Sequence, residues 1–195
     1  MNFPAYPEYQ DSGIEWLGEI PAHWGSRNLR RIFHIYNGST PKSDQSEFWN
    51  GEILWATPDD LGGQESIYLS STRRLITLTG YNSCGTTLVP RHSLIISTRA
   101  PVGYVAIAAK EMCTNQGCRS LVPTINTETR YFCYLLLSVT KILQILSSGS
   151  TFQELSSHSL ASFKLPTPPL PEQRTIADFL DHETAKIDAL IGEQR

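Results

Sequence analysis

The chain has 195 residues, of which 40% are hydrophobic and 18% are charged. Its 7 Phe, 8 Tyr and 4 Trp exclude a globally disordered chain, because so many apolar side chains can form a core. The net charge of −3 excludes a generally basic nucleic-acid coat, but not a sequence-selective reader with local basic patches.

The first predicted elements are short. Residues 1–24 are irregular and rich in Tyr and Trp, and we expect them to wrap against the domain. Asn28 to Tyr36 fits either a strand or a short helix, and Gly38 to Pro41 ends it. Ile53 to Ala56 predicts a short strand, which ends at the turn Thr57 to Asp60.

The second half of the domain has clearer patterns. Leu75 to Ser83 is ambiguous, but Ser93 to Ser97 and Tyr104 to Ala108 are apolar runs between Pro and Gly that predict strands. Thr129 to Leu146 predicts one long helix, apolar nearly all round and therefore buried. Phe163 to Leu165 predicts a last strand. Together the elements predict a mixed α/β (α+β) domain with a twisted, mixed sheet.

The C-terminal segment differs from the rest. Pro166 to Pro171 holds four prolines and predicts a stiff connector, and Pro171 suits the first turn of a helix that follows. The helix carries an apolar seam without a partner in this segment, which favours an outward, coiled-coil helix over one folded back on its own domain. The seam residues are Ile176, Phe179, Leu180, Ile187, Leu190 and Ile191.

The sequence predicts a cytoplasmic protein. Residues 1–26 contain no Lys or Arg and no long apolar run, so we expect no signal peptide. The most apolar stretch, Tyr131 to Leu146, contains Lys141 and falls short of a membrane span. The cysteines form no C-x-x-C pair and lack a histidine pair at zinc-finger spacing, so we expect buried thiols and no metal. They are Cys84, Cys113, Cys118 and Cys133.

Positive charge gathers in the middle of the chain. Between Ser66 and Thr127 six basic residues accompany one acid, Glu111, a local balance of +5. Residues 172–195 have a balance of −3. The basic stretch is either a solvated surface or a surface that faces phosphates, and charge counting does not decide between them.

Both ends of the chain resemble the specificity subunits of type I restriction-modification systems. Tyr6 to Trp24 (YPEYQDSGIEWLGEIPAHW) is similar to their usual opening. Pro168 to Gln173 (PPLPEQ), with Ile176 to Asp181 (IADFLD) and Lys186 to Ile191 (KIDALI), resembles the start of their conserved helical spacer. Gly149 to Leu155 (GSTFQEL) also fits. The middle is expected to vary, because each member reads its own DNA.

The resemblance implies a target recognition domain, residues 1–165, followed by a connector and the start of a spacer and dimerisation helix, residues 166–195. Family members usually carry two such domains and two antiparallel helices, and each domain reads one half of a split double-stranded DNA target. The implied subunit is not catalytic: it directs methylation (M) subunits to adenine and, when present, restriction (R) subunits. With one domain and one helix, this chain is either a half-length subunit, which must form a homodimer or pair with another half-subunit, or a fragment.

Motifs for catalysis are missing from the sequence. An adenine methyltransferase holds the flipped base with an Asn/Asp-Pro-Pro-aromatic site, and the nearest string, Thr167 to Leu170, lacks both the acceptor and the aromatic ring. No Gly-rich loop for S-adenosylmethionine or ATP occurs, and the pair Asp59–Asp60 suits Mg²⁺ poorly because adjacent side chains seldom point the same way. We therefore expect no cofactor.

DNA reading needs groups that hold phosphates and groups that reach base edges. Such groups lie on four turns, Gly38 to Lys42, Thr57 to Asp60, Ser97 to Arg99 and Asn115 to Arg119. For any single residue, ordinary turn chemistry is an equally good explanation, so the prediction depends on the set. The candidate DNA-binding residues are Ser39, Thr40, Lys42, Thr57, Asp59, Asp60, Arg73, Arg74, Thr98, Arg99, Asn115, Gln116 and Arg119.

Two other kinds of function stay open at this point. A small cytoplasmic enzyme would use Cys118 or Cys84 as its nucleophile and His92 or His158 as its base. An assembly or decoy protein would occupy methyltransferase subunits without reading DNA.

Overall fold

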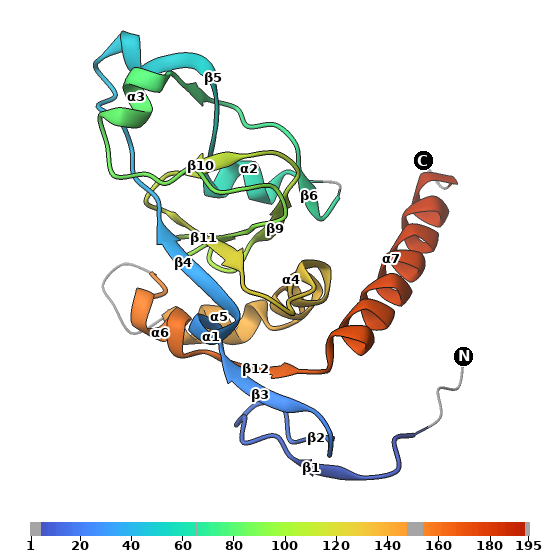
Figure 1. Ribbon diagram of the computed structural model, residues 1–195. Helices are drawn as coiled ribbons and strands as arrows, with labels where there is room; N and C mark the ends of the chain where they lie inside the picture. Colours follow the sequence, from blue (N-terminus) through green and yellow to red (C-terminus); the bar gives the residue numbers. More distant parts are fainter. Residues whose placement is uncertain (1–4, 65, 148–153, 194–195) are drawn as a thin grey trace.

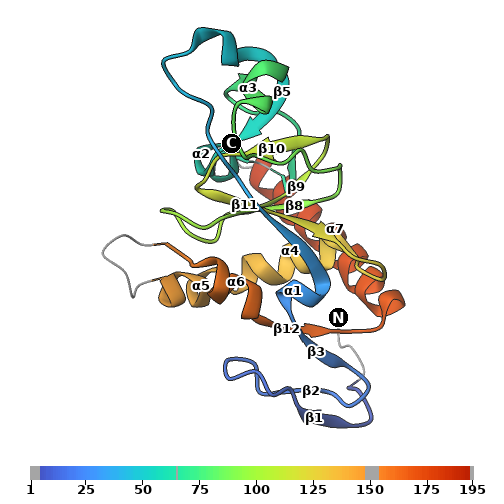
Figure 2. The same ribbon diagram turned by 60° about the vertical axis from the view of Figure 1, so that its left-hand side comes forward.

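The computed structural model describes residues 5–64, 66–147 and 154–193. Figures 1 and 2 show an elongated molecule with an N-terminal hairpin at one end, a small lobe around β5 and α3 at the other, and a long C-terminal helix beside its body. The predicted mixed α/β fold is confirmed.

The strands form mixed sheets. The central sheet has the order β4-β11-β8-β9-β6, and a smaller sheet has the order β10-β5-β7. Only β6 with β9 and β5 with β10 pair in parallel among the described strands. The central strands are β4 (Phe33–Asn37), β6 (Tyr68–Leu69), β8 (Leu94–Ser97), β9 (Val105–Ala108) and β11 (Cys118–Pro123). The smaller sheet comprises β5 (Trp49–Ala56), β7 (Leu75–Ile76) and β10 (Met112–Thr114), and the remaining antiparallel pairs are β1 (Tyr9–Asp11) with β2 (Glu19–Pro21) and β3 (Gly25–Asn28) with β12 (Lys164–Thr167).

Both faces of the central sheet are covered at β8 and β9, which explains why these two strands are apolar throughout. In β8, Leu94 and Ile96 belong to the core under the helices, whereas Ile95 belongs to a second cluster with Leu61 of α2 and Met112 of β10. The helices are α1 (Leu29–Ile32), α2 (Pro58–Gly62), α3 (Leu78–Asn82), α4 (Thr129–Ser138), α5 (Thr140–Ser147), α6 (Ser157–Ser162) and α7 (Leu170–Glu193), with a 3-10 turn η1 (Ser46–Phe48).

The predicted helix from Thr129 to Leu146 is wrong as a single element, because it is divided into α4 and α5 at Val139. The hydroxyls of Ser138 and Thr140 donate to the carbonyls of Leu135 and Leu137, both at 2.7–2.8 Å. These bonds compete with the backbone bonds of a continuous helix, and the β-branched residues at the break also disfavour it.

Other boundaries also differ from the sequence predictions. Residues 1–24 are not irregular throughout, since they contain the β1–β2 hairpin. As expected, this segment packs on the domain, and Trp16 stacks on Phe163 with ring centroids 5.9 Å apart. The ambiguous ranges Asn28 to Tyr36 and Leu75 to Ser83 each contain both a strand and a helix. Pro166 pairs with β3 inside β12, so the connector is shorter than predicted.

Phe132 of α4 tests the core assignment. It is fully buried and meets Phe33 edge-on, with ring centroids 5.5 Å apart. Phe132→Ala is expected to lower the free energy of unfolding by about 3–5 kcal/mol, because a large cavity forms. Ile125→Ala, at a side chain 89% exposed, should change it by less than about 0.5 kcal/mol. Chemical denaturation measures both, and equal losses would contradict this core.

Candidate nucleic-acid interface

The four turns singled out in the sequence meet in space and form what we call the turn cluster: Gly38–Thr40, Thr57–Asp60, Thr98–Arg99 and Asn115–Gly117. The Gly117 carbonyl accepts the N–H groups of Thr98 and Arg99 at 2.8 and 3.2 Å. The N–H of Asn115 donates to Ala56, at the start of the second turn, at 2.9 Å. Turns distant in sequence are therefore held together by backbone hydrogen bonds.

The first turn reaches the cluster through a close backbone contact. The N–H of Ser39 donates to the Thr114 carbonyl at 2.9 Å, and the Thr40 hydroxyl donates to the Gln116 side chain. A Cβ atom on Gly38 would lie 1.9 Å from the Asn115 carbonyl oxygen, so only glycine fits there. The half-buried Asn115 side chain accepts the Gly117 N–H at 2.9 Å and shapes its own turn.

Several candidate side chains of these turns and their neighbours are exposed. Arg99 is half exposed, and its Nε lies 3.2 Å from Oε1 of Glu154. The exposed guanidinium of Arg73 lies 3.8 Å from Asp59, a weak surface pair. The ammonium of Lys42, between β4 and η1, makes no hydrogen bond or ion pair to any described residue. These groups are free to exchange their partners for a polar ligand.

Other candidates are engaged within the fold instead. Asp60 is buried and closes a capping box, since its Oδ2 accepts the N–H and the hydroxyl of Thr57 at 2.8 and 2.7 Å. Thr98 is buried and its hydroxyl donates to the Gly117 carbonyl. Thr57, Asp60 and Thr98 therefore support the turns, and we leave these three side chains out of the proposed DNA contacts.

Arg119 is likewise an internal residue. Its Nη1 donates to the carbonyls of Gln116 and Cys118, both at 3.0 Å, and its Nη2 lies 3.9 Å from Glu154. Burial lowers the pKa of this guanidinium. Arg119 therefore supports the fourth turn, Asn115–Gly117, from inside the fold, and we leave it out of the proposed DNA contacts.

Arg74 is held by a tryptophan pair that the sequence reasoning missed. Its guanidinium carbon lies 3.4 Å from the ring centroid of Trp49 and 5.7 Å from that of Trp55. The Trp55 indole donates to the Ser39 carbonyl at 2.9 Å, which ties this lobe to the turn cluster. No clear sequence signal marks this pair, because the register of β5 shifts between Trp49 and Ile53 and regular alternation does not connect Trp49 with Trp55.

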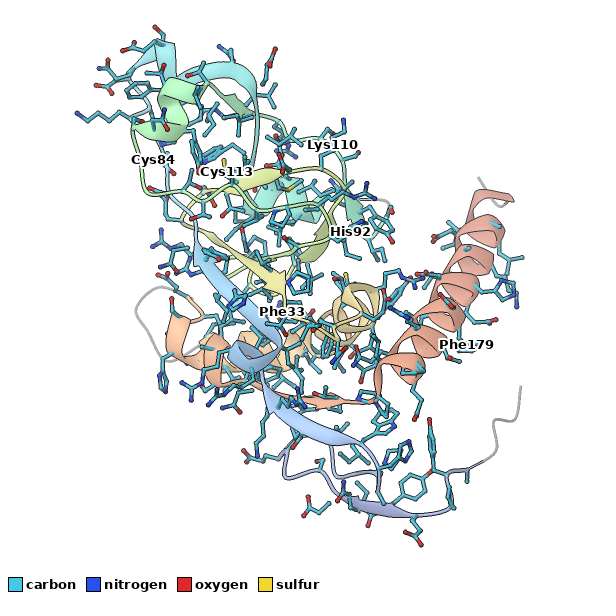
Figure 3. The ribbon with its side chains drawn as sticks, in the orientation of Figure 1. Phe33, Cys84, His92, Lys110, Cys113 and Phe179 are labelled. Atoms are coloured by element: carbon cyan, nitrogen blue, oxygen red, sulfur yellow. The ribbon has the colours of Figure 1, made fainter. Side chains whose placement is uncertain are left out.

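The alternative thiol enzyme finds little support in the geometry. Cys118 is buried, and burial raises its pKa, which is opposite to what a nucleophilic thiolate requires. Figure 3 shows Cys84 near α3, well separated from His92. Among the described residues, no group of three His, Cys, Asp or Glu side chains is placed to hold a metal ion. Within the same residues, no helix is long and apolar enough to cross a membrane.

The C-terminal helix is divided between two environments. In its first half, Ala177 is buried and Ile176 packs against the core, so this part of the predicted seam faces the chain's own domain. Phe179 and Leu180 are half-buried. In the outer half, Ile187, Leu190 and Ile191 are 55%, 60% and 49% exposed. The helix is thus folded back at its base and unpartnered in its outer apolar positions among the described residues.

Comparison with known proteins identifies the family. A family model described as the type I restriction modification DNA specificity domain matches residues 21–194. The chain belongs to this family. It is 37% identical over 184 residues to the type I restriction enzyme MjaIX specificity subunit of Methanocaldococcus jannaschii, covering 93% of this chain and 42% of the relative. It is 29% identical to the EcoR124I/EcoR124II specificity subunit of Escherichia coli, covering 93% and 45%.

Solved structures with a similar fold come from the same kind of system. One solved structure comes from work on the complex assembly and conformational transition of the type I R-M system. It superposes on this chain with a TM-score of 0.76 at 25% identity, and the match covers 92% of this chain and 43% of the solved chain. The HsdS subunit of Thermoanaerobacter tengcongensis shares the fold, with a TM-score of 0.73 at 23% identity over 96% and 43%. The resemblance inferred from the two ends of the sequence is confirmed. This specificity-domain chain spans less than half the length of these relatives.

Gly38 offers a test of the turn cluster in this specificity domain. Gly38→Ala is expected to push Gly38–Thr40 away from Asn115 because the added methyl group overlaps a carbonyl. We expect a loss of about 1–3 kcal/mol in unfolding free energy and faster amide exchange at Ser39. Gly85→Ala is the control, since nothing lies within 4 Å of its added Cβ. Unchanged exchange at Ser39 would show that the close approach is not required.

Proposed function

We propose that this chain is a sequence-specific DNA reader of a type I restriction-modification complex and that it recognises one half of a split double-stranded target through the turn cluster. The convergence of four turns from distant parts of the sequence carries this proposal. The backbone N–H of Arg99 donates to the Gly117 carbonyl, which brings Arg99 close to Gln116. Arg73, Arg74 and Lys42 lie on flanking segments. Loops on a rigid scaffold are where binding residues concentrate.

The proposed contacts divide into two kinds. Arg99 can fork onto the O6 and N7 atoms of guanine, and the Gln116 amide can pair with adenine in the same groove. Lys42 and Arg73 suit phosphates, which position the protein without reading sequence. Arg74, held over Trp49, has lost rotamer freedom before binding, which favours a fixed contact.

The partners follow from the family. We propose that M subunits carry out adenine methylation, that R subunits join when present, and that this chain directs both without being catalytic. A cytoplasmic location remains our prediction. The relatives named above are specificity subunits, and DNA recognition is therefore favoured over an assembly or decoy role.

Pairing through the outer half of α7 completes the proposal. Two copies, or this chain and another half-subunit, would cover Ile187, Leu190 and Ile191. Because a twofold dimer presents the same surface twice, a homodimer would read two inverted, identical half-sites with a fixed spacer.

The pairing is tested by placing charge on the exposed seam. The double variant Ile187→Asp and Ile191→Asp is expected to sediment as a monomer, because unpaired charge would be buried between the helices. Ala189→Asp lies on the opposite side of α7 and should leave the assembly unchanged. A wild-type chain that sediments as a monomer throughout, alone and with a candidate half-subunit, would contradict this seam.

The recognition surface is tested with DNA. Methylome sequencing of cells that carry this chain and an M subunit supplies the cognate site. Arg99→Ala and Gln116→Ala should each weaken binding of that site by about 1–3 kcal/mol and affect random duplex little. Lys42→Ala should weaken both duplexes alike and lower the slope of log affinity against log salt by about one.

Lys110→Ala serves as the control, because Lys110 is an exposed cation of the same basic stretch without a hydrogen bond or ion pair to the described turns. It should leave cognate affinity unchanged. Normal cognate affinity in the Arg99, Gln116 and Lys42 variants, with the fold intact, would remove the turn cluster from the DNA interface.

A further inference from the structure

A charged junction joins α4 to the C-terminal helix. Arg130 of α4 donates through Nε to Glu128 at 2.9 Å. Through Nη1 it donates to Asp178 and Asp181 of α7 at 2.8 and 2.6 Å. Tyr134, one turn along α4, donates to the other oxygen of Asp181 at 2.6 Å. Burial and this hydrogen bond raise the pKa of Tyr134 to about 12, so its hydroxyl remains a donor at neutral pH.

A buried amide completes the junction at the base of α7. Oε1 of Gln173 accepts the N–H of Glu128 at 2.9 Å, and Nε2 donates to the Pro168 carbonyl at 2.8 Å. Contacts continue up to Thr184, whose hydroxyl lies 3.3 Å from the Tyr134 oxygen. The junction therefore holds about three turns of the helix.

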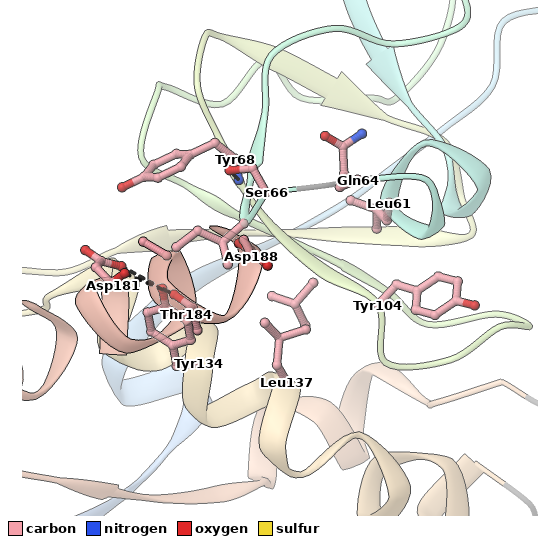
Figure 4. Close-up of a pocket in the computed structure, with 13 residues that line it drawn as sticks. Leu61, Gln64, Ser66, Tyr68, Tyr104, Tyr134, Leu137, Asp181, Thr184 and Asp188 are labelled. Atoms are coloured by element: carbon pink, nitrogen blue, oxygen red, sulfur yellow. Dashed lines mark hydrogen bonds between the residues drawn. The ribbon is translucent and has the colours of Figure 1, made fainter. Parts of the chain in front are cut away.

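Beyond Thr184 the helix separates from the domain. No hydrogen bond or ion pair joins α7 to the rest of the described chain there. Instead a cleft of about 540 Å³ lies between the two helices α4 and α7 and a third wall that includes Gln64 and Tyr68. Figure 4 shows residues that line it. The direction of the outer helix is consequently set at the junction and not by packing along its length.

Arg130 is the centre of this junction. Its planar guanidinium bonds two carboxylates one turn apart on α7 and a third on the domain, so it restricts both the rotation and the tilt of the helix. The number of base pairs between two half-sites depends on how freely the helix can rotate and tilt against the domain. One base pair changes the separation of two half-sites by about 3.4 Å and their phase by roughly 35°.

We infer that Arg130 is a positioning residue for DNA spacing: by locking α7 to the recognition domain, it restricts the two half-sites to one separation. The inference rests on the proposed function. Helix length sets how far apart two recognition domains are held, and the Arg130 junction sets the angle between each domain and its helix.

The experiment selects bound duplexes from a random-sequence library, with the full chain assembled with its M subunits, and reads half-sites and spacers separately. Arg130→Gln should retain the wild-type half-sites, while spacers one base pair longer or shorter become roughly tenfold more frequent, equivalent to about 1.4 kcal/mol. Asp181→Asn should act in the same direction and covers the case in which Arg130→Gln fails to fold. Arg174→Gln is the matched control, because Arg174 of α7 lies only 3.8 Å from the same Glu128 carboxylate but is largely exposed.

The outcomes separate the two proposals. A single spacer in folded Arg130→Gln and Asp181→Asn overturns the inference while the proposed function stands. Equal broadening in Arg174→Gln also overturns it, since loss of any positive charge at this position would then suffice. A changed half-site in Arg130→Gln would place Arg130 in base recognition and overturn its positioning role. If the wild-type complex selects no half-site, the proposed function fails and the inference fails with it.

Discussion

The turn at Asn115–Gly117 is the constraint on which the turn cluster depends. Its backbone groups fix the positions of segments that enter from three other parts of the chain. The carbonyl of Gly117 holds Thr98 and Arg99, and the carbonyl of Asn115 leaves no room for a side chain on Gly38. Because backbone bonds carry this geometry, side chains at the turn tips can vary while the tips stay in place. Such an arrangement suits the proposed role in DNA recognition.

A second contact joins the two ends of the sequence that carry the family resemblance. Glu172, at the start of α7, accepts hydrogen bonds from Trp24 and Tyr6 at 2.9 and 3.1 Å and lies 2.6 Å from Nε2 of His23. Burial by itself raises the pKa of Glu172, but these bonds outweigh it and lower the pKa below its usual value. The contact between Glu172 and the N-terminal segment is therefore stabilised at neutral pH and weakens as pH falls through the pKa of Glu172. The two end motifs therefore pack together in the folded chain.

The helix α7 combines a fixed base with an open outer half. Its base is held by Gln173 and the Arg130 junction, and its outer apolar residues, such as Ile187 and Leu190, have no partner among the described residues. This division resolves the choice between a helix folded back and a helix that reaches outward, because each description applies to one half. A base that is rigidly attached gives the outer half a defined direction, which a spacing device requires.

Local sequence patterns predict several of the strands and turns, and the two end motifs predict the family. Apolar runs such as Ser93–Ser97 and Tyr104–Ala108 predict buried strands because their burial pattern is local. The candidate turns were also found, since Gly, Pro, Asn and Asp mark turns by their own backbone chemistry. Which turn residues are exposed depends on the folded chain. Asp60 caps α2 and Arg119 donates to a backbone carbonyl, whereas Arg99 is half exposed beside Glu154. The Asp60 cap and the bond from Arg119 to Gln116 are local contacts, each between residues three apart, whereas the pair Arg99–Glu154 joins segments distant in sequence. No local pattern encodes a partner that only the folded chain brings near.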